Sequence, residues 1–118
     1  LAYGGYPLIS YARHPLDSAE VYGTMLSKVK GLVQRAGRAP DALDTALYVP
    51  WYQLGKPVTS QSGERSPFTG EAEQIAEDVR AYGQCGLNHL VIGFESHNLR
   101  ISLERIERFG KEIMPLCS

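Results

Sequence analysis

Hydrophobic residues recur at helical spacing in three separate stretches of the chain. In the first, between Asp17 and Gly37, an apolar residue returns every three or four positions, as on one face of a helix. The expected buried stripe consists of Val21, Met25, Val29, Leu32 and Val33. Asp17 and Glu20 have the spacing of a capping box, and Gly37 followed by Pro40 predicts the end of the helix.

Two further helices are expected. One begins after Thr69, the expected N-cap, and is closed by Gly83 and Gly86. Its buried face should contain Ala72, Ile75, Ala76, Val79 and Tyr82. The other covers residues 99–114 and ends at Pro115. Its buried face should contain Leu103, Ile106, Ile113 and either Phe109 or Gly110. Exposed ion pairs four residues apart are expected between Glu104 and Arg108 and between Glu107 and Lys111.

Two other stretches are almost continuously apolar. Residues 45–52 (TALYVPWY) and 89–94 (HLVIGF) are rich in β-branched and aromatic types and predict strands covered on both faces, as in a parallel sheet. Pro50 cannot donate to a strand ladder, so regular pairing should end near it. Residues 53–68 are expected to form a polar loop, and loops of this length are usually functional or mobile.

The alternation of helices and strands predicts an α/β fold with right-handed βαβ units and parallel strands. Only two strands are clear, and residues 1–9 are a candidate for the end of a third. A complete (β/α)8 barrel takes about 200 residues or more. We therefore expect residues 1–118 to form one segment of a larger sheet, with apolar faces left for a missing part of the barrel or a further copy to cover.

Composition narrows the classes of partner. The net charge of −1 gives no basis for binding nucleic acid or a membrane surface, and no apolar run has the length of a membrane span. Cys85 and Cys117 have no redox or metal-binding spacing, so a reducing cytoplasm is the expected location and no metal site is predicted.

Several motifs, in order, resemble the luciferase-like monooxygenase superfamily. FTGEAEQIAEDVRAY at residues 68–82, followed by GLNHLVI at 86–92, is similar to that family's helix-7 and strand-8 region. LERIERFGKEIMP at 103–115 resembles its last helix, and AGRAP at 36–40 resembles its turn before strand 7. YGGYP at 3–7 stands where the family often has Asp-Gly-Trp-x-Pro, without the Asp and the Trp.

The resemblance implies the C-terminal part of a (β/α)8 TIM barrel. It also implies chemistry on a small organic substrate, either hydride transfer with the deazaflavin coenzyme F420 or oxygenation with reduced FMN. Most contacts to the cofactor ring in that family come from the first five strands, which have no counterpart here. Catalytic residues are therefore not assigned, and activity of this chain alone stays an open question.

Ligands in such barrels lie at the carboxyl ends of the strands. The candidate pocket residues are those that follow the expected strands, together with Tyr6 from the irregular start: Tyr6, Trp51, Tyr52, Glu95, Ser96 and His97. Trp51 and Tyr52 either wall a cofactor pocket or pack under the loop. Ser96 either donates to a phosphate or caps the third helix.

Charged residues near these strand ends have two interpretations each. Glu95 and His97 form an acid–base pair, or Glu95 is a solvated carboxylate and His97 caps the helix or is exposed. Lys56 and Arg65 meet an anionic cofactor tail or are solvated loop charges, and His89, at the opposite end of its strand, is expected to be structural.

Two further classes of function remain: a non-catalytic barrel piece that acts by association, and a small independent α/β binding domain.

Overall fold

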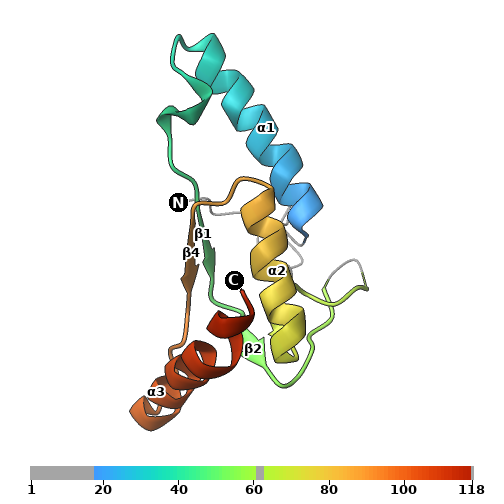
Figure 1. The fold of residues 1–118 in the computed structure, drawn as a ribbon, viewed down its shortest axis with the longest axis vertical. Helices are drawn as coiled ribbons and strands as arrows, with labels where there is room; N and C mark the ends of the chain where they lie inside the picture. The colour runs from blue at the N-terminus through green and yellow to red at the C-terminus, as the bar shows by residue number, and fades with distance from the viewer. Residues whose placement is uncertain (1–17, 61–62, 118) are drawn as a thin grey trace.

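A parallel βαβ unit forms the centre of the computed structural model, which describes residues 18–60 and 63–117 (Figure 1). Strand β1 (Ala46–Val49) pairs with β4 (His89–Ile92), and helix α2 (Ala72–Gln84) lies between them in sequence. The register places Ala46 beside His89 and Val49 beside Ile92. The chain is thus a mixed α/β protein with parallel strands, as the alternating pattern predicted.

Helix α1 (Ala19–Arg35) begins one residue later than expected. Its N-cap is Ser18, whose side chain accepts a hydrogen bond from the Val21 N–H at 3.1 Å. The predicted cap, Asp17, lies outside the described residues. The helix ends as predicted at Gly37, which has φ +83°, and the N–H of Arg38 returns to Val33 O at 3.1 Å, a Schellman arrangement.

The buried face of α1 is rotated from the predicted stripe. Tyr22 and Leu26 are buried, whereas Val29 and Leu32 are 45% and 59% exposed. The helix contacts α2 only along its first half (Figure 1). Its second half faces the segment that contains the short 3-10 helix Pro40–Ala42, and an open apolar groove remains between the two. The predicted stripe was therefore wrong at Val29 and Leu32.

Among the described residues, one face of the β1–β4 sheet is more buried than the other. Leu47 and Val49 of β1 are buried against α2 and its neighbours, but Val91 on β4 is 45% exposed. The expectation of strands covered on both faces is therefore wrong for β4. Among the described residues, each of these two strands has one neighbour, so each keeps an unpaired edge.

The stretch expected to be a polar loop contains short strand pairings. Strand β2 (Gln53–Leu54) pairs in parallel with β3 (Thr69–Gly70), and Thr59 bridges to Arg65. Phe68, with φ +65°, is fully buried. The loop therefore forms a second small sheet that packs into the core.

Helix α2 has the predicted buried face, with Ile75, Ala76 and Tyr82 inside. Its capping was mispredicted. Thr69 is a buried residue of β3, and the N-cap is Glu71, which forms a capping box with Gln74. The Glu71 N–H donates to Gln74 Oε1 at 2.9 Å.

Helix α3 (Leu99–Arg108) continues into a π turn (Phe109–Ile113) and a 3-10 turn (Met114–Leu116). Ile113 is fully buried as expected, but Leu103 and Ile106 are 56% and 50% exposed, so their predicted inward position is wrong. Its ion pairs also differ in part, since Arg100 pairs with Glu104 at 2.7 Å and Arg108 with Glu112 at 2.9 Å. Glu107 pairs with Lys111 as predicted. No helix in the described part of the chain has the length and apolarity required to cross a membrane.

Candidate functional site

The carboxyl ends of β1 and β4 reach the same edge of the sheet, because the strands are parallel. Trp51 and Tyr52 follow β1, and Phe94 and Glu95 follow β4 after Gly93. The ladder extends past the strands, since the Gly93 N–H donates to Val49 O at 2.9 Å. This edge is where a ligand site is expected in a parallel α/β protein.

Tyr52 is a buried aromatic residue in the middle of this edge. Its ring meets those of Phe94 and Phe109 edge-on, with centroids 5.3 and 5.7 Å away, and those two rings are 5.6 Å apart. Its hydroxyl has no hydrogen-bond partner among the described residues. Burial raises the pKa of Tyr52 to about 12, opposed by the nearby charge of Arg108. The trio packs the residues that follow β1 and β4 against the π turn, and Tyr52 also lines one of the grooves at this edge.

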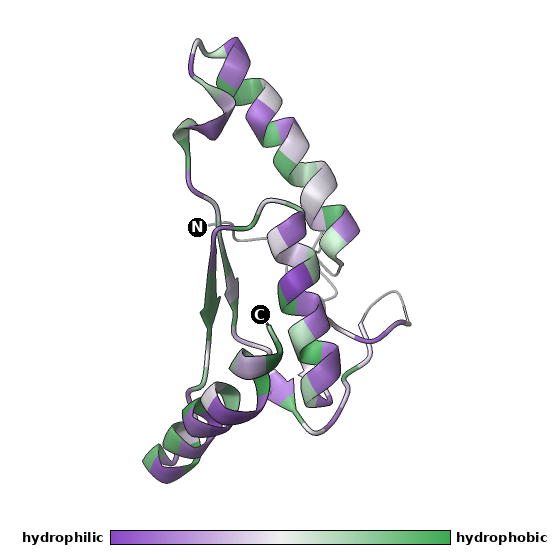
Figure 2. Cartoon of the chain, in the orientation of Figure 1, coloured by the Kyte–Doolittle hydropathy of each residue, from purple (hydrophilic) through white to green (hydrophobic). Residues whose placement is uncertain are grey.

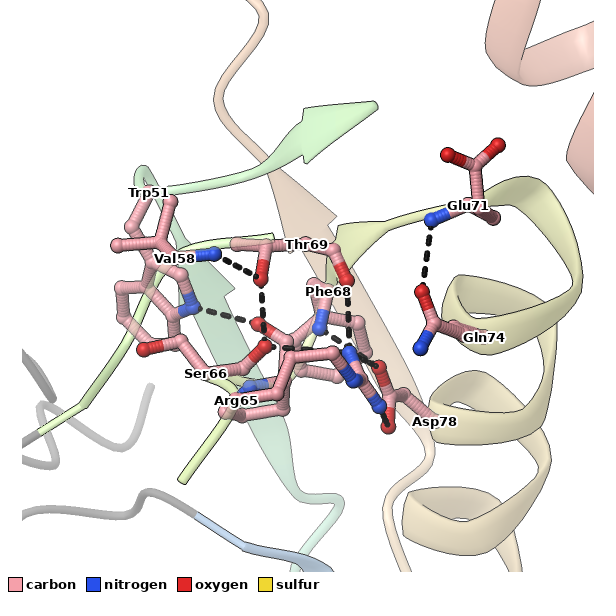
Figure 3. A network of polar contacts seen from close by, with 10 residues as sticks. Trp51, Val58, Arg65, Ser66, Phe68, Thr69, Glu71, Gln74 and Asp78 are labelled. Carbon is pink, nitrogen blue, oxygen red and sulfur yellow. Dashed lines mark hydrogen bonds and ion pairs between the residues drawn. The ribbon is translucent and has the colours of Figure 1, made fainter. Parts of the chain in front are cut away.

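Trp51 supports the ordered loop. Its indole N–H donates to Pro67 O at 2.9 Å, and the half-buried ring packs against the core (Figure 3). Trp51 lines neither of the two grooves at this edge. The packing interpretation therefore describes its position better than the pocket interpretation.

The larger groove, of about 580 Å³, runs between the segment after β4 and helix α3. It is lined by Phe94, Glu95, Ser96, His97, Leu99, Ser102 and Ile106. Three of the predicted pocket residues, Glu95, Ser96 and His97, are thus brought together. Glu95 and His97 are exposed, and in the described part of the chain no hydrogen bond or ion pair joins them.

Ser96 orders the turn into α3 without being its N-cap. Its N–H donates to Ser102 Oγ at 2.8 Å, and its own Oγ accepts from the Asn98 N–H at 3.3 Å. The N-cap is Asn98, whose side chain accepts from the Arg100 N–H at 2.9 Å. The N-cap interpretations of Ser96 and His97 were therefore wrong, and both side chains remain at the groove.

Glu95 folds back over Gly93. A Cβ atom at position 93 would lie 2.8 Å from Glu95 Oε2 and 3.0 Å from the backbone Cα of Pro50, so a larger residue would displace the Glu95 carboxylate and crowd the chain after β1. Sequence reasoning missed Gly93. The available signal was a glycine within an apolar strand, which often marks a close approach of other groups.

A second, more polar groove of about 420 Å³ lies on the other side of α3. It is lined by Tyr52, Gln53, Leu54, Ile101, Glu104, Arg105 and Arg108. Arg105 connects the two grooves, because its Nη1 donates to Glu95 O at 2.8 Å. No sequence pattern distinguished Arg105 from the other arginines of this helix.

Arg65 is held by Asp78 in a clamp between the loop and α2. The guanidinium makes two hydrogen bonds of 2.9 Å to the carboxylate, which also accepts from the Phe68 N–H at 2.8 Å (Figure 3). Arg65 donates in addition to Thr69 O at 2.7 Å. The hydrogen bonds to the Asp78 carboxylate raise the pKa of Arg65. Arg65 is thus committed to the fold rather than available to an anionic tail, while Lys56 is exposed.

The remaining predictions concern Tyr6 and metal ions. Tyr6 lies outside the described residues. Within residues 18–60 and 63–117 there is no group of three His, Cys, Asp or Glu side chains able to hold a metal ion.

Comparisons of the chain with protein-family models, curated proteins and solved structures found no match.

Proposed function

We propose that this chain contributes the carboxyl edge of a luciferase-like (β/α)8 barrel that acts in the cytoplasm on a small organic substrate. The deazaflavin coenzyme F420 is the favoured cofactor, and FMN is the alternative. The observation that carries the proposal is the groove beside the carboxyl end of β4, one of the two parallel strands, lined by Glu95, Ser96 and His97. Two of the motifs that resemble the family, at residues 86–92 and 103–115, lie on β4 and on α3 with the turns that follow it, next to this groove.

The chemistry of the groove fits a planar ring with polar edges. Phe94, Leu99 and Ile106 provide apolar surface for a ring face, and Ser96 and His97 provide hydrogen-bonding groups at the rim. The bound cofactor would accept or supply the hydride or electrons. The residues of this chain would orient it, and His97 or Glu95 would hold or accept a proton at its imidazole nitrogen or carboxylate oxygen.

Fluorescence titration with coenzyme F420, and with FMN in parallel, tests this proposal. We expect saturable binding of at least one cofactor, weakened roughly tenfold by His97→Ala, which corresponds to the loss of one hydrogen bond to a charged group. His89→Ala is the matched control, because His89 is also exposed but lies at the amino end of β4. Absence of saturable binding of both cofactors, or equal effects of the two substitutions, would contradict a cofactor site in this groove.

The second candidate function is a non-catalytic piece that acts by association with another chain or a further copy. Large apolar side chains at the surface favour it, since Val91, Leu99 and Leu103 are 45%, 74% and 56% exposed. Within residues 18–60 and 63–117, β1 and β4 each have one strand neighbour, and the edge left unpaired favours association too. Sedimentation across a range of concentrations tests it, because a piece of this kind forms species larger than one chain and binds neither cofactor alone.

A further inference from the structure

The exposed face of α3 carries a row of apolar side chains. Leu99, Leu103 and Ile106 are 74%, 56% and 50% exposed. The first part of α3 extends away from the rest of the chain, and it shows apolar positions beside strongly polar ones (Figure 2). Contiguous apolar surface with charged borders is typical of an interaction site.

The spacing of this row indicates a helix as its partner. Leu99, Leu103, Ile106 and Gly110 are separated by four, three and four residues, which is the alternation of a coiled-coil seam. The π turn then changes the direction of the side chains, and Ile113 is buried in the core of its own chain. The seam is therefore short and ends near Gly110.

The charged residues beside the seam on one copy of the chain are complementary to those on a second copy. Arg100 follows Leu99 and Glu107 follows Ile106, so both occupy the same flanking position and have opposite signs. In an antiparallel helix pair, flanking positions of this type face each other. In a pair with twofold symmetry, Arg100 of each copy would face Glu107 of the other, which gives two such contacts. Leu99 would lie opposite Gly110, which has no side chain and has open space beside it.

Both charged side chains are accessible for such pairing. The side chains of Arg100 and Glu107 are 72% and 60% exposed. Their contacts within the helix, to Glu104 and Lys111, are surface ion pairs that exchange readily. A parallel pair would place Arg100 beside position 95 of the second copy, which precedes α3, and Glu107 beside uncharged Ser102, so only the antiparallel arrangement pairs the two charges within the helix.

We propose that two copies of this chain associate through α3 as an antiparallel helix pair, with Leu99, Leu103 and Ile106 in the seam and Arg100 against Glu107. This inference rests on the second candidate function and gives it a defined surface. It is an alternative to the cofactor proposal. Because Leu99 and Ile106 also line the larger groove, pairing through α3 would cover that groove.

Sedimentation equilibrium of the 118-residue chain provides the test. The expected mass rises with concentration from that of one chain, 13.0 kDa, toward twice that value. Leu103→Glu should leave a single chain at every concentration, with unchanged circular dichroism. Arg100→Glu should weaken association roughly tenfold, since it creates two repulsive contacts, and Arg100→Glu with Glu107→Arg should restore it.

Glu104→Arg is the matched control, because it removes the same ion pair within the helix but lies off the seam. Its association should stay within about twofold of the wild type. A single chain at all concentrations would overturn the proposal. So would association that survives Leu103→Glu, which would place the contact on another surface such as the strand edges. Failure of the double charge reversal to restore association would refute the antiparallel register.

Discussion

The clamp between Arg65 and Asp78 allows a sharp test of what holds the ordered loop in place. Asp78→Asn keeps the size of the side chain but removes its charge. The one amide oxygen can take the place of Oδ2, where it accepts from both Arg65 Nη1 and the Phe68 N–H, and the new NH2 group then faces the Arg65 Nη2 donor. The substitution therefore breaks at least one of three hydrogen bonds of 2.8–2.9 Å.

Burial determines the magnitude of this effect. The side chains of Arg65 and Asp78 are 28% and 15% exposed, so the pair lies between a surface ion pair and a fully buried one. Breaking a buried pair costs about 3–5 kcal/mol, and exposed pairs contribute about 1 kcal/mol or less. We expect Asp78→Asn to lower the free energy of unfolding by about 2 kcal/mol. With a urea slope of about 1 kcal/mol per molar, the midpoint should fall by about 2 M.

Urea unfolding followed by tryptophan fluorescence is the assay, because Trp51 is the single tryptophan and donates to Pro67 within the same loop. Glu112→Gln is the control. Arg108 and Glu112 also make two hydrogen bonds, at 3.1 and 2.9 Å, but on an exposed helix surface. Equal shifts for the two substitutions would refute the argument that burial determines the contribution of the clamp.

Three further predictions concern the core and the loop. The free energy of unfolding should fall as pH rises from about 10 to about 12, because burial raises the pKa of Tyr52 to about 12 in the folded state. Tyr52→Phe should abolish this step in pH-dependent unfolding. It should not destabilise the protein at neutral pH, since the Tyr52 hydroxyl has no hydrogen-bond partner among the described residues. Ile113→Ala should cost about 2–5 kcal/mol in urea unfolding, and Ile106→Ala, at a 50% exposed site, should cost much less; similar losses would contradict the inward turn of Ile113. Gly70→Ala should destabilise by about 1–3 kcal/mol, because φ is +106° and the new Cβ would lie 2.4 Å from Gln74 Oε1, and calorimetry showing no change would contradict the strain.

Part of the candidate site was accessible from the sequence. The positions after an apolar strand lie at its carboxyl end, so the placement of Glu95, Ser96 and His97 around one groove followed from local order alone. The role of Trp51 was not decided, because the same aromatic residue suits a pocket wall and a loop support. The acceptor that selects the second role, Pro67 O, lies sixteen residues away.

The sequence by itself determined the type and order of the elements. Spacing of apolar residues and local stop signals such as Gly37 act within a few neighbouring residues, and these predicted α1, β1, α2, β4 and α3 and the parallel pairing of the strands. These signals work at short range, so they do not depend on the rest of the fold.

The tertiary structure decided which apolar residues of α1 and α3 are buried and which partner Arg65 has. Tyr22 and Leu26 are inside while Val29 and Leu32 are not, because α2 covers only part of α1. The side chain of Arg65 pairs with Asp78, thirteen residues away, and is not a solvated loop charge. Burial and pairing depend on which distant surfaces meet, and a linear pattern of apolar and polar positions does not contain that information.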